Sequence, residues 1–346
     1  MSNPIAMAAQ LASQTARFGW YFGINRLLER QSSQLGERPT AYKPTRPVPN
    51  TREMMTDLAQ LMLADANAVR EGIFPPLPDA GDTPREHLTR IRHMFTDLPS
   101  ALQRRGAEDA ASARTVPEAE GLPDYFTQDF HFQTGGYLTD ESAKLYDVQV
   151  ETLFMGSAGP MRRAALRPIA EAMRWRDQRG VKLLDVACGT GRFLRQVRLV
   201  YPALGLTGID LSKPYLSEGE RQFSGLRAAA WLSANAEAIP LPDASQDIVT
   251  SIFLFHELPP EVRLRVTAEM ARVLKPDGTL VFIDSLQMGD KPGWDGMLEA
   301  FPVRFHEPYY RHYAIDDLDA MFSGVGLAPV ETSLHFMSKM MVRRKG

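Results

Sequence analysis

The second half of the chain alternates short apolar runs with amphipathic stretches, beginning near Val181. Short apolar runs are typical of strands buried in a sheet, and a three- to four-residue apolar period is typical of the helices that cover it. Strands are predicted at 182–187, 205–210, 228–233, 247–253 and 278–285, and helices at 192–201, 213–223, 260–274 and 315–323. The segment from Pro329 to Arg343 is expected to form two strands without a helix between them. This order predicts βαβ units and a largely parallel sheet covered on both faces.

The first half shows helical periodicity and no strand-like alternation of any length. Asn50 and Glu53 have the spacing of a capping box, and apolar residues then recur at helical spacing as far as Gly72. Further helices are predicted from Thr83, from Thr139 to Gly156 and from Pro160 to Gly180, whereas Gly36 to Asn50 and Ala107 to Pro123 are expected to be non-helical. The first half is therefore predicted to be mainly helical.

The N-terminal segment carries apolar residues on one rough face and several arginines. It is interpreted as a first helix that packs on its own domain, with an interfacial or targeting segment as the alternative. No stretch approaches eighteen uninterrupted apolar residues, so no membrane-spanning helix and no integral membrane association are expected.

Composition narrows the functional classes. The 346 residues carry a formal charge of −3, which gives no electrostatic reason to expect nucleic acid as a partner. Cys188 is the single cysteine, so neither an intramolecular disulfide nor a cysteine-based metal cluster can form. These features favour a cytoplasmic protein.

The most informative motif lies where the first predicted strand ends in a glycine-rich turn. Leu183 to Phe193 reads LLDVACGTGRF, and Asp210 ends the next strand nineteen residues beyond Gly191. Glycines let backbone amides approach a ligand, and an acid at the end of the second strand is placed to accept hydrogen bonds from ribose hydroxyls. The predicted ligand is therefore a nucleoside derivative.

The details of this turn separate two classes of nucleoside ligand. A dinucleotide site requires G-x-G-x-x-G, and the third glycine is absent here. The remaining pattern, Asp185-x-x-Cys-Gly-Thr-Gly191, resembles motif I of class I S-adenosylmethionine-dependent methyltransferases. Segments 233–243, 247–253 and 269–285 are similar to the later motifs of that family in order and spacing, and the resemblance is closest to its ubiquinone/menaquinone-biosynthesis branch.

This resemblance implies an α/β fold with a Rossmann-like seven-stranded sheet, mostly parallel with an antiparallel last strand. It does not reach the first 150 residues, where helical periodicity predicts a mainly helical N-terminal domain. It also implies S-adenosyl-L-methionine as cofactor, with Asp185 near its ammonium group, Asp210 on its ribose and Leu211 beside its adenine. Asn235 stands where the family often has an acid for the adenine amine. The implied cofactor-binding set is Asp185, Ala187, Gly189, Gly191, Asp210, Leu211, Asn235, Ala236 and Phe253.

Catalytic and substrate-binding residues are less readable, because methyl transfer needs orientation more than covalent chemistry. His256 follows the fourth predicted strand and is the candidate base, with Glu257 as a group that could orient it. The alternative is that His256 caps the next helix or lines the cofactor pocket. His306 is a further catalytic candidate, and Tyr137, Phe305, Tyr309 and Tyr310 are candidates for substrate binding in two aromatic-rich segments. These segments could equally be interdomain packing, and no metal site is predicted from His131, His256 and His306.

We expect residues 1–160 to form a helical substrate-cap and dimerisation region and residues 161–346 to form the methyltransferase domain. The predicted function is transfer of a methyl group to an O, S, N or C nucleophile of a small organic molecule. The alternatives are a non-catalytic cofactor or nucleoside sensor, an assembly protein, or an RNA methyltransferase.

Overall fold

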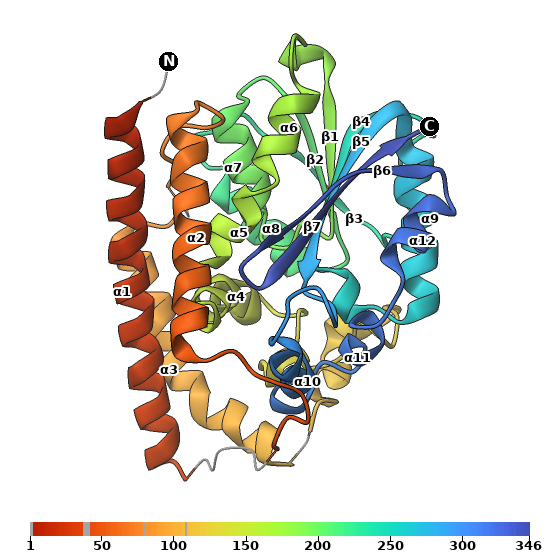
Figure 1. The fold of residues 1–346 in the computed structure, drawn as a ribbon. Helices are drawn as coiled ribbons and strands as arrows, with labels where there is room; N and C mark the ends of the chain where they lie inside the picture. The colour runs from red at the N-terminus through yellow and green to blue at the C-terminus, as the bar shows by residue number, and fades with distance from the viewer. Residues whose placement is uncertain (1–2, 37–41, 79–80, 108) are drawn as a thin grey trace.

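The computed structural model describes residues 3–36, 42–78, 81–107 and 109–346. Helices occupy the first half of the chain and stand beside a sheet formed by the second half (Figure 1). The helices before the sheet are α1 Pro4–Gln34, α2 Thr51–Arg70, α3 Pro84–Ala107, α4 Asp140–Leu153, α5 Ala158–Arg163 and α6 Leu166–Ala172. Within the described residues no strand precedes Lys182, as predicted. None of the helices in these ranges is both long and apolar enough to cross a membrane.

Local capping explains where two of these helices begin. The Asn50 side chain accepts from the Glu53 amide, and the Glu53 carboxylate accepts from the Asn50 amide, so the predicted capping box opens α2. The hydroxyl of Thr139 accepts from the Ser142 amide and opens α4. Residues 42–50 are non-helical as expected, whereas residues 37–41 of that predicted connector lie outside the described residues.

The single helix predicted from Pro160 to Gly180 is wrong. The chain forms α5 and α6, separated by a turn, and the left-handed φ of 62° at Trp175 follows α6. Pro168 has no amide hydrogen, so it cannot donate to the carbonyl of Ala164 and the helix restarts at Leu166. The pattern therefore indicated helix in this segment but missed both the break and the end of α6 at Ala172.

The seven-stranded sheet has the order β3-β2-β1-β4-β5-β7-β6. The strands are β1 Lys182–Val186, β2 Gly205–Asp210, β3 Ala230–Ser233, β4 Gln246–Ile252, β5 Leu274–Ser285, β6 Leu327–His335 and β7 Ser338–Lys345. β1 to β5 are parallel, and β7 pairs antiparallel with both β5 and β6. The predicted mostly parallel sheet with an antiparallel last strand is confirmed.

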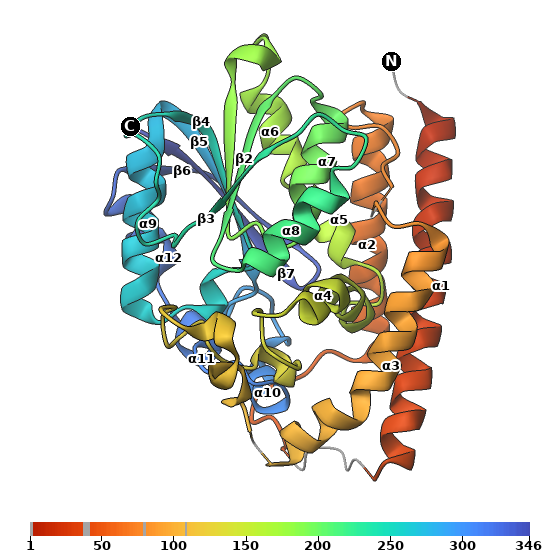
Figure 2. The ribbon, with the colours of Figure 1, turned by 180° about the vertical axis from the view of Figure 1, so that it is seen from behind.

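Successive residues of the central strands face opposite sides, which gives the sheet two apolar cores. Leu183, Val281 and Ile283 pack on the face covered by α6 and by α7 Arg192–Val200. Leu184, Leu280 and Phe282 pack on the other face, under α9 Pro260–Val273 and α12 Leu318–Ser323. Figure 2 shows these helices on the two sides of the sheet, with α8 Lys213–Gln222 beside α7. Two further helices, α10 Asp295–Arg304 and α11 Tyr310–Tyr313, follow β5, and neither was predicted.

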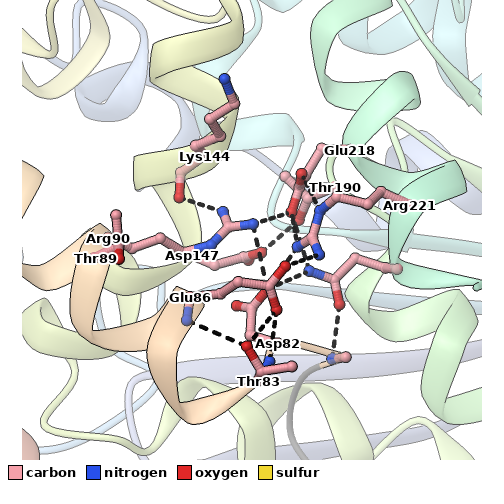
Figure 3. A network of polar contacts seen from close by, with 12 residues as sticks. Asp82, Thr83, Glu86, Thr89, Arg90, Lys144, Asp147, Thr190, Glu218 and Arg221 are labelled. Carbon is pink, nitrogen blue, oxygen red and sulfur yellow. Dashed lines mark hydrogen bonds and ion pairs between the residues drawn. The ribbon is translucent and has the colours of Figure 1, made fainter.

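A buried ionic network joins the helical half to the sheet half (Figure 3). Glu218 of α8 accepts from Arg90 of α3 at 2.6 Å and from Arg221 at 2.6 Å, and both arginines also pair with Asp82. The side chains of Arg90, Asp82 and Glu218 are at most 8% exposed. A buried charge is strongly destabilising when it loses its partner, so this network fixes the position of α3 relative to α8.

Replacement of Glu218 by alanine is expected to lower the free energy of unfolding by about 2–3 kcal/mol, since two buried arginines lose a shared carboxylate. Urea denaturation followed by circular dichroism would measure it. Glu220→Ala, at an exposed position of the same helix, is the matched control and should change stability by less than about 0.5 kcal/mol. Equal effects of the two substitutions would contradict this account of the interface.

Candidate active site at the carboxyl ends of the strands

The glycine turn after β1 is held by the acid that ends β2. Asp210 accepts from the Gly189 amide through Oδ2 at 2.8 Å and from the Ser212 amide through Oδ1 at 2.8 Å. Burial raises the pKa of Asp210, and these backbone hydrogen bonds oppose that rise. Asp210 therefore shapes the turn and presents a carboxylate at the same edge of the sheet.

The two glycines of the turn have different tasks. Both have left-handed φ values, 53° at Gly189 and 68° at Gly191. A Cβ on Gly191 would lie 2.5 Å from the Trp231 ring, whereas a Cβ on Gly189 would meet only Tyr215, at 4.0 Å. Gly191 is thus required for close packing, and Gly189 leaves open space beside the pocket.

Gly191→Ala is expected to destabilise the fold by roughly 2 kcal/mol or more, through the clash with Trp231 and the left-handed φ. Gly189→Ala should cost only about 1–2 kcal/mol from the same backbone strain, while weakening ligand binding in the pocket. Thermal melts and calorimetric titration with S-adenosylhomocysteine would separate the two effects. A Gly191→Ala protein as stable as the unmodified protein would show that close packing against Trp231 does not require glycine at this position.

A single pocket joins the glycine turn to a wall of aromatic side chains. It encloses about 820 Å³ when the part open to solvent is counted. Seven of the nine predicted cofactor residues line it, namely Ala187, Gly189, Asp210, Leu211, Asn235, Ala236 and Phe253. Aromatic side chains line the same pocket, namely Tyr125, Phe126, Phe130, Tyr137 and Tyr146. The pocket therefore combines the polar groups of the glycine turn and Asp210 with a mainly aromatic lining.

Asp185 and Gly191, the other two predicted cofactor residues, are not among the lining residues. The Asp185 side chain is buried at the end of β1 and accepts from the Thr250 hydroxyl at 2.6 Å. Burial raises the pKa of Asp185 to about 7; the bond from Thr250 opposes this, and the nearby carboxylate of Asp210 adds to it.

This raised pKa makes stability depend on pH. The carboxyl of Asp185 has a pKa of about 3.9 in the unfolded chain and about 7 in the folded protein. The stability that the protonated form contributes is therefore fully present below the unfolded pKa and is lost as the pH rises through the folded pKa. Asp185→Asn should therefore stabilise the ligand-free protein at pH 8 more than at pH 5. Urea denaturation at the two pH values would measure the difference, and an equal effect at both would contradict the proposed ionisation.

His256 is held by an acid other than the one expected. Its Nδ1 lies 2.5 Å from Asp284 Oδ1 at the end of β5, whereas its Nε2 is 3.8 Å from Glu257 Oε1. Burial opposes the protonation of His256, but the charge and hydrogen bond of Asp284 outweigh it and raise its pKa to about 10. His256 is therefore an imidazolium at neutral pH, and it does not line the pocket.

Glu257 does line the pocket, at its aromatic end. Its Oε1 accepts from the Tyr137 hydroxyl at 2.6 Å. Burial raises the pKa of Glu257 to about 7. The charge of His256 opposes this rise, and the carboxylate of Glu307 adds to it. Among the three predicted catalytic residues, Glu257 is the one that reaches the pocket.

The structure brings together the two aromatic-rich segments singled out in the sequence. The segment before α4 lies beside α10 and α11 (Figure 2). Gln128 links them, because its Oε1 lies 2.9 Å from His306 Nε2 and its Nε2 donates to the Tyr309 hydroxyl at 3.1 Å. His131 Nε2 pairs with Glu307 at 2.8 Å.

Of the predicted substrate residues, Tyr137 lines the pocket, whereas Phe305, Tyr309 and Tyr310 are not among the residues that line it. Tyr310 shares a hydrogen bond with Ser285, and Phe305 packs against His131. His306, which contacts Gln128, does not line the pocket either.

Some residues of the site were not predicted from the sequence. Asp284 was missed, although its position at the end of a strand adjacent to β4 was a usable signal. Glu307 lies in the second aromatic-rich segment, and no local pattern pairs it with His131 across 176 residues of chain. Such pairs become visible only when the loops meet.

Comparison with known proteins agrees with this geometry. Residues 183–278 match the family described as a methyltransferase domain. This part of the chain is a class I methyltransferase domain. The family implies S-adenosylmethionine as the cofactor, and its model covers the glycine turn, Asp210, β4 and the turn after it.

Two curated relatives extend the similarity beyond the family model. The demethylmenaquinone methyltransferase of Listeria welshimeri is 34% identical over 149 residues, which are 40% of this chain and 62% of that protein. The ubiquinone/menaquinone biosynthesis C-methyltransferase UbiE of Methylobacterium nodulans is 34% identical over 167 residues, 47% of this chain and 63% of that protein. The chain thus spans less than two thirds of the length of either relative.

Among solved structures, a putative sarcosine dimethylglycine methyltransferase from Galdieria sulphuraria aligns with a TM-score of 0.43 and 17% identity. That alignment covers 56% of this chain and 88% of the other.

Proposed function

We propose that this protein transfers a methyl group from S-adenosylmethionine to a small aromatic molecule held between the sheet and the helical half. The observation that carries the proposal is that the glycine turn, Asp210 and several aromatic side chains line one pocket. A ligand site of mainly apolar lining with few polar groups is what a small organic acceptor requires. The names of the two curated relatives make a reduced quinone ring the first acceptor to test.

The residues present fit the cofactor. Asp210 offers carboxylate oxygens for two ribose hydroxyls, and the absence of a Cβ at Gly189 leaves space for the ligand beside the turn. Leu211, Asn235 and Ala236 line the same end and would hold the adenine. When bound, the cofactor supplies the methyl group, and the electron pair of the breaking S–C bond returns to sulfur.

The chain's own residues would orient the acceptor and exclude water. Phe126, Phe130 and Tyr146 form an apolar wall against which a ring can lie. Holding the two reactants in line can account for about 7–11 kcal/mol of barrier reduction in favourable cases. At this end of the pocket Glu257 is the charged group, and we propose that it controls the proton that the acceptor loses as the new bond to the methyl carbon forms.

The protein incubated with S-adenosylmethionine and a chemically reduced demethylmenaquinone analogue should give a product heavier by one CH₂, with S-adenosylhomocysteine in equal amount. Mass spectrometry measures both. Phenols, thiols and amines of similar size form the comparison panel. Tight cofactor binding with no turnover of any panel member would instead support a non-catalytic sensor.

We also propose that the protein is cytoplasmic, does not act on nucleic acid, and forms a homodimer through the helical half. Exposed Trp20, Phe22 and Leu27 on α1 support self-association. Light scattering after size-exclusion chromatography would give the oligomeric state, and a monomer at micromolar concentration would refute the dimer.

A further inference from the structure

Three potential metal-binding side chains from three separate segments meet at the aromatic end of the pocket. His131 comes from the turn Phe130–Phe132, Glu257 from the turn that follows β4, and Glu307 from the loop after α10. One ligand atom of each lies within 4.8 Å of the others, and His131 Nε2 is 2.8 Å from Glu307 Oε1. Neither His256 nor His306, considered from the sequence, belongs to this group.

Glu307 supplies an independent sign that something is bound here. It is 3% exposed, and neither carboxylate oxygen has a hydrogen-bond partner among the described residues. Its Oε1 forms an ion pair with His131, whose side chain is 26% exposed. Buried carboxylates are normally satisfied by several donors, so Oε2, which has no hydrogen-bond partner among the described residues, points to a missing cationic partner.

The surrounding charges favour a cation over an anion. Glu257 places a second carboxylate in the group, and its hydrogen bond from Tyr137 brings no charge. The imidazole of His256 is 3.8 Å from Glu257 and is already paired with Asp284 at 2.5 Å. Two clustered carboxylates are therefore balanced by one imidazole at most.

We propose that His131, Glu257 and Glu307 bind a divalent metal ion. One imidazole nitrogen with two carboxylates is a ligand set typical of Mn²⁺ or Zn²⁺, and ligand atoms around such an ion lie on the order of 3–4 Å apart. The observed separations need only small side-chain adjustments to reach that arrangement.

The position of the site suggests what the ion does. Because Glu257 lines the pocket, an ion bound to it lies at the pocket's edge and can coordinate an oxygen of the acceptor. A metal-bound hydroxyl loses its proton more readily and is fixed in direction. Glu257 would then control the acceptor's proton through the ion. This role rests on the proposed function, whereas metal binding does not.

The test is direct metal binding by the full chain. The protein is stripped with a chelator, dialysed and titrated with Mn²⁺, with free Mn²⁺ followed by electron paramagnetic resonance and Zn²⁺ used as competitor. We expect one site per chain, with Glu307→Gln and His131→Gln each weakening binding at least tenfold. Glu261→Gln, at an exposed position of α9, is the control and should bind as the unmodified protein does.

Absence of saturable binding up to millimolar Mn²⁺ and Zn²⁺ would overturn the proposal, as would unchanged affinity in both Glu307→Gln and His131→Gln. If Glu307→Gln does not fold, His131→Gln decides, since His131 is the more exposed ligand. Titration with S-adenosylhomocysteine on the same samples keeps the two proposals apart. Metal binding without cofactor binding would refute the methyltransferase function and leave the metal site standing.

Discussion

Asp210→Ala is expected to lower the affinity for S-adenosylhomocysteine by at least about 100-fold. Two hydrogen bonds from ribose hydroxyls to a charged acceptor contribute about 1.5–3 kcal/mol each, and 1.4 kcal/mol is a factor of ten in affinity. Asp210 also accepts from the Gly189 amide, so its removal loosens the turn that borders the pocket. Isothermal titration calorimetry measures the affinity directly.

Two variants make this result interpretable. Asp210→Asn keeps the shape and one acceptor, so it should lose less affinity than alanine does. Asp243→Ala removes an exposed acid after β3 and should bind normally. Circular dichroism melts show whether each variant folds. Wild-type affinity in a folded Asp210→Ala protein would mean that the nucleoside does not lie at the end of β2.

Glu257→Gln is expected to lower kcat for the acceptor by at least about 100-fold, with the dissociation constant of S-adenosylhomocysteine changed by less than about twofold. Control of a transferred proton contributes roughly 10²–10⁴-fold in rate. Glutamine preserves the size and the hydrogen bond from Tyr137 but removes the charge at the aromatic end of the pocket. Initial rates at saturating cofactor, together with calorimetry, provide the two measurements.

Tyr137→Phe tests whether Glu257 must be held in place. Tyr137 is a positioning residue in this scheme, so its loss should reduce kcat less than the loss of Glu257 does. Glu261→Gln is the exposed control. A Glu257→Gln enzyme with normal turnover would remove Glu257 from the reaction and leave the acceptor's proton to solvent.

The order of strands and helices in the second half could be predicted because each element has its own local sequence pattern. β1, β2 and β4 are short apolar runs, and the glycine turn and Asp210 stand at strand ends, where parallel strands bring them to one edge. The helix break near Pro168 and the unpredicted α10 show the limit of this reasoning. Apolar periodicity reveals neither every helix break nor every short helix.

The active-site constellation could not be predicted in the same way. His256 was expected beside Glu257, its neighbour in sequence, yet Asp284 from an adjacent strand holds it. The packing task of Gly191 depends on Trp231, which reaches it from β3. In each case the partner is distant along the chain.

The amino-acid sequence by itself determined the fold class and the nucleoside end of the pocket, because strand periodicity, the glycine turn and Asp210 act through neighbouring residues and the regular geometry of a parallel sheet. Only the tertiary structure decided the other end. Tyr137, His131, Glu257 and Glu307 meet because loops from both halves of the chain close over the same strand ends, and no local pattern specifies which side chains such loops place in contact.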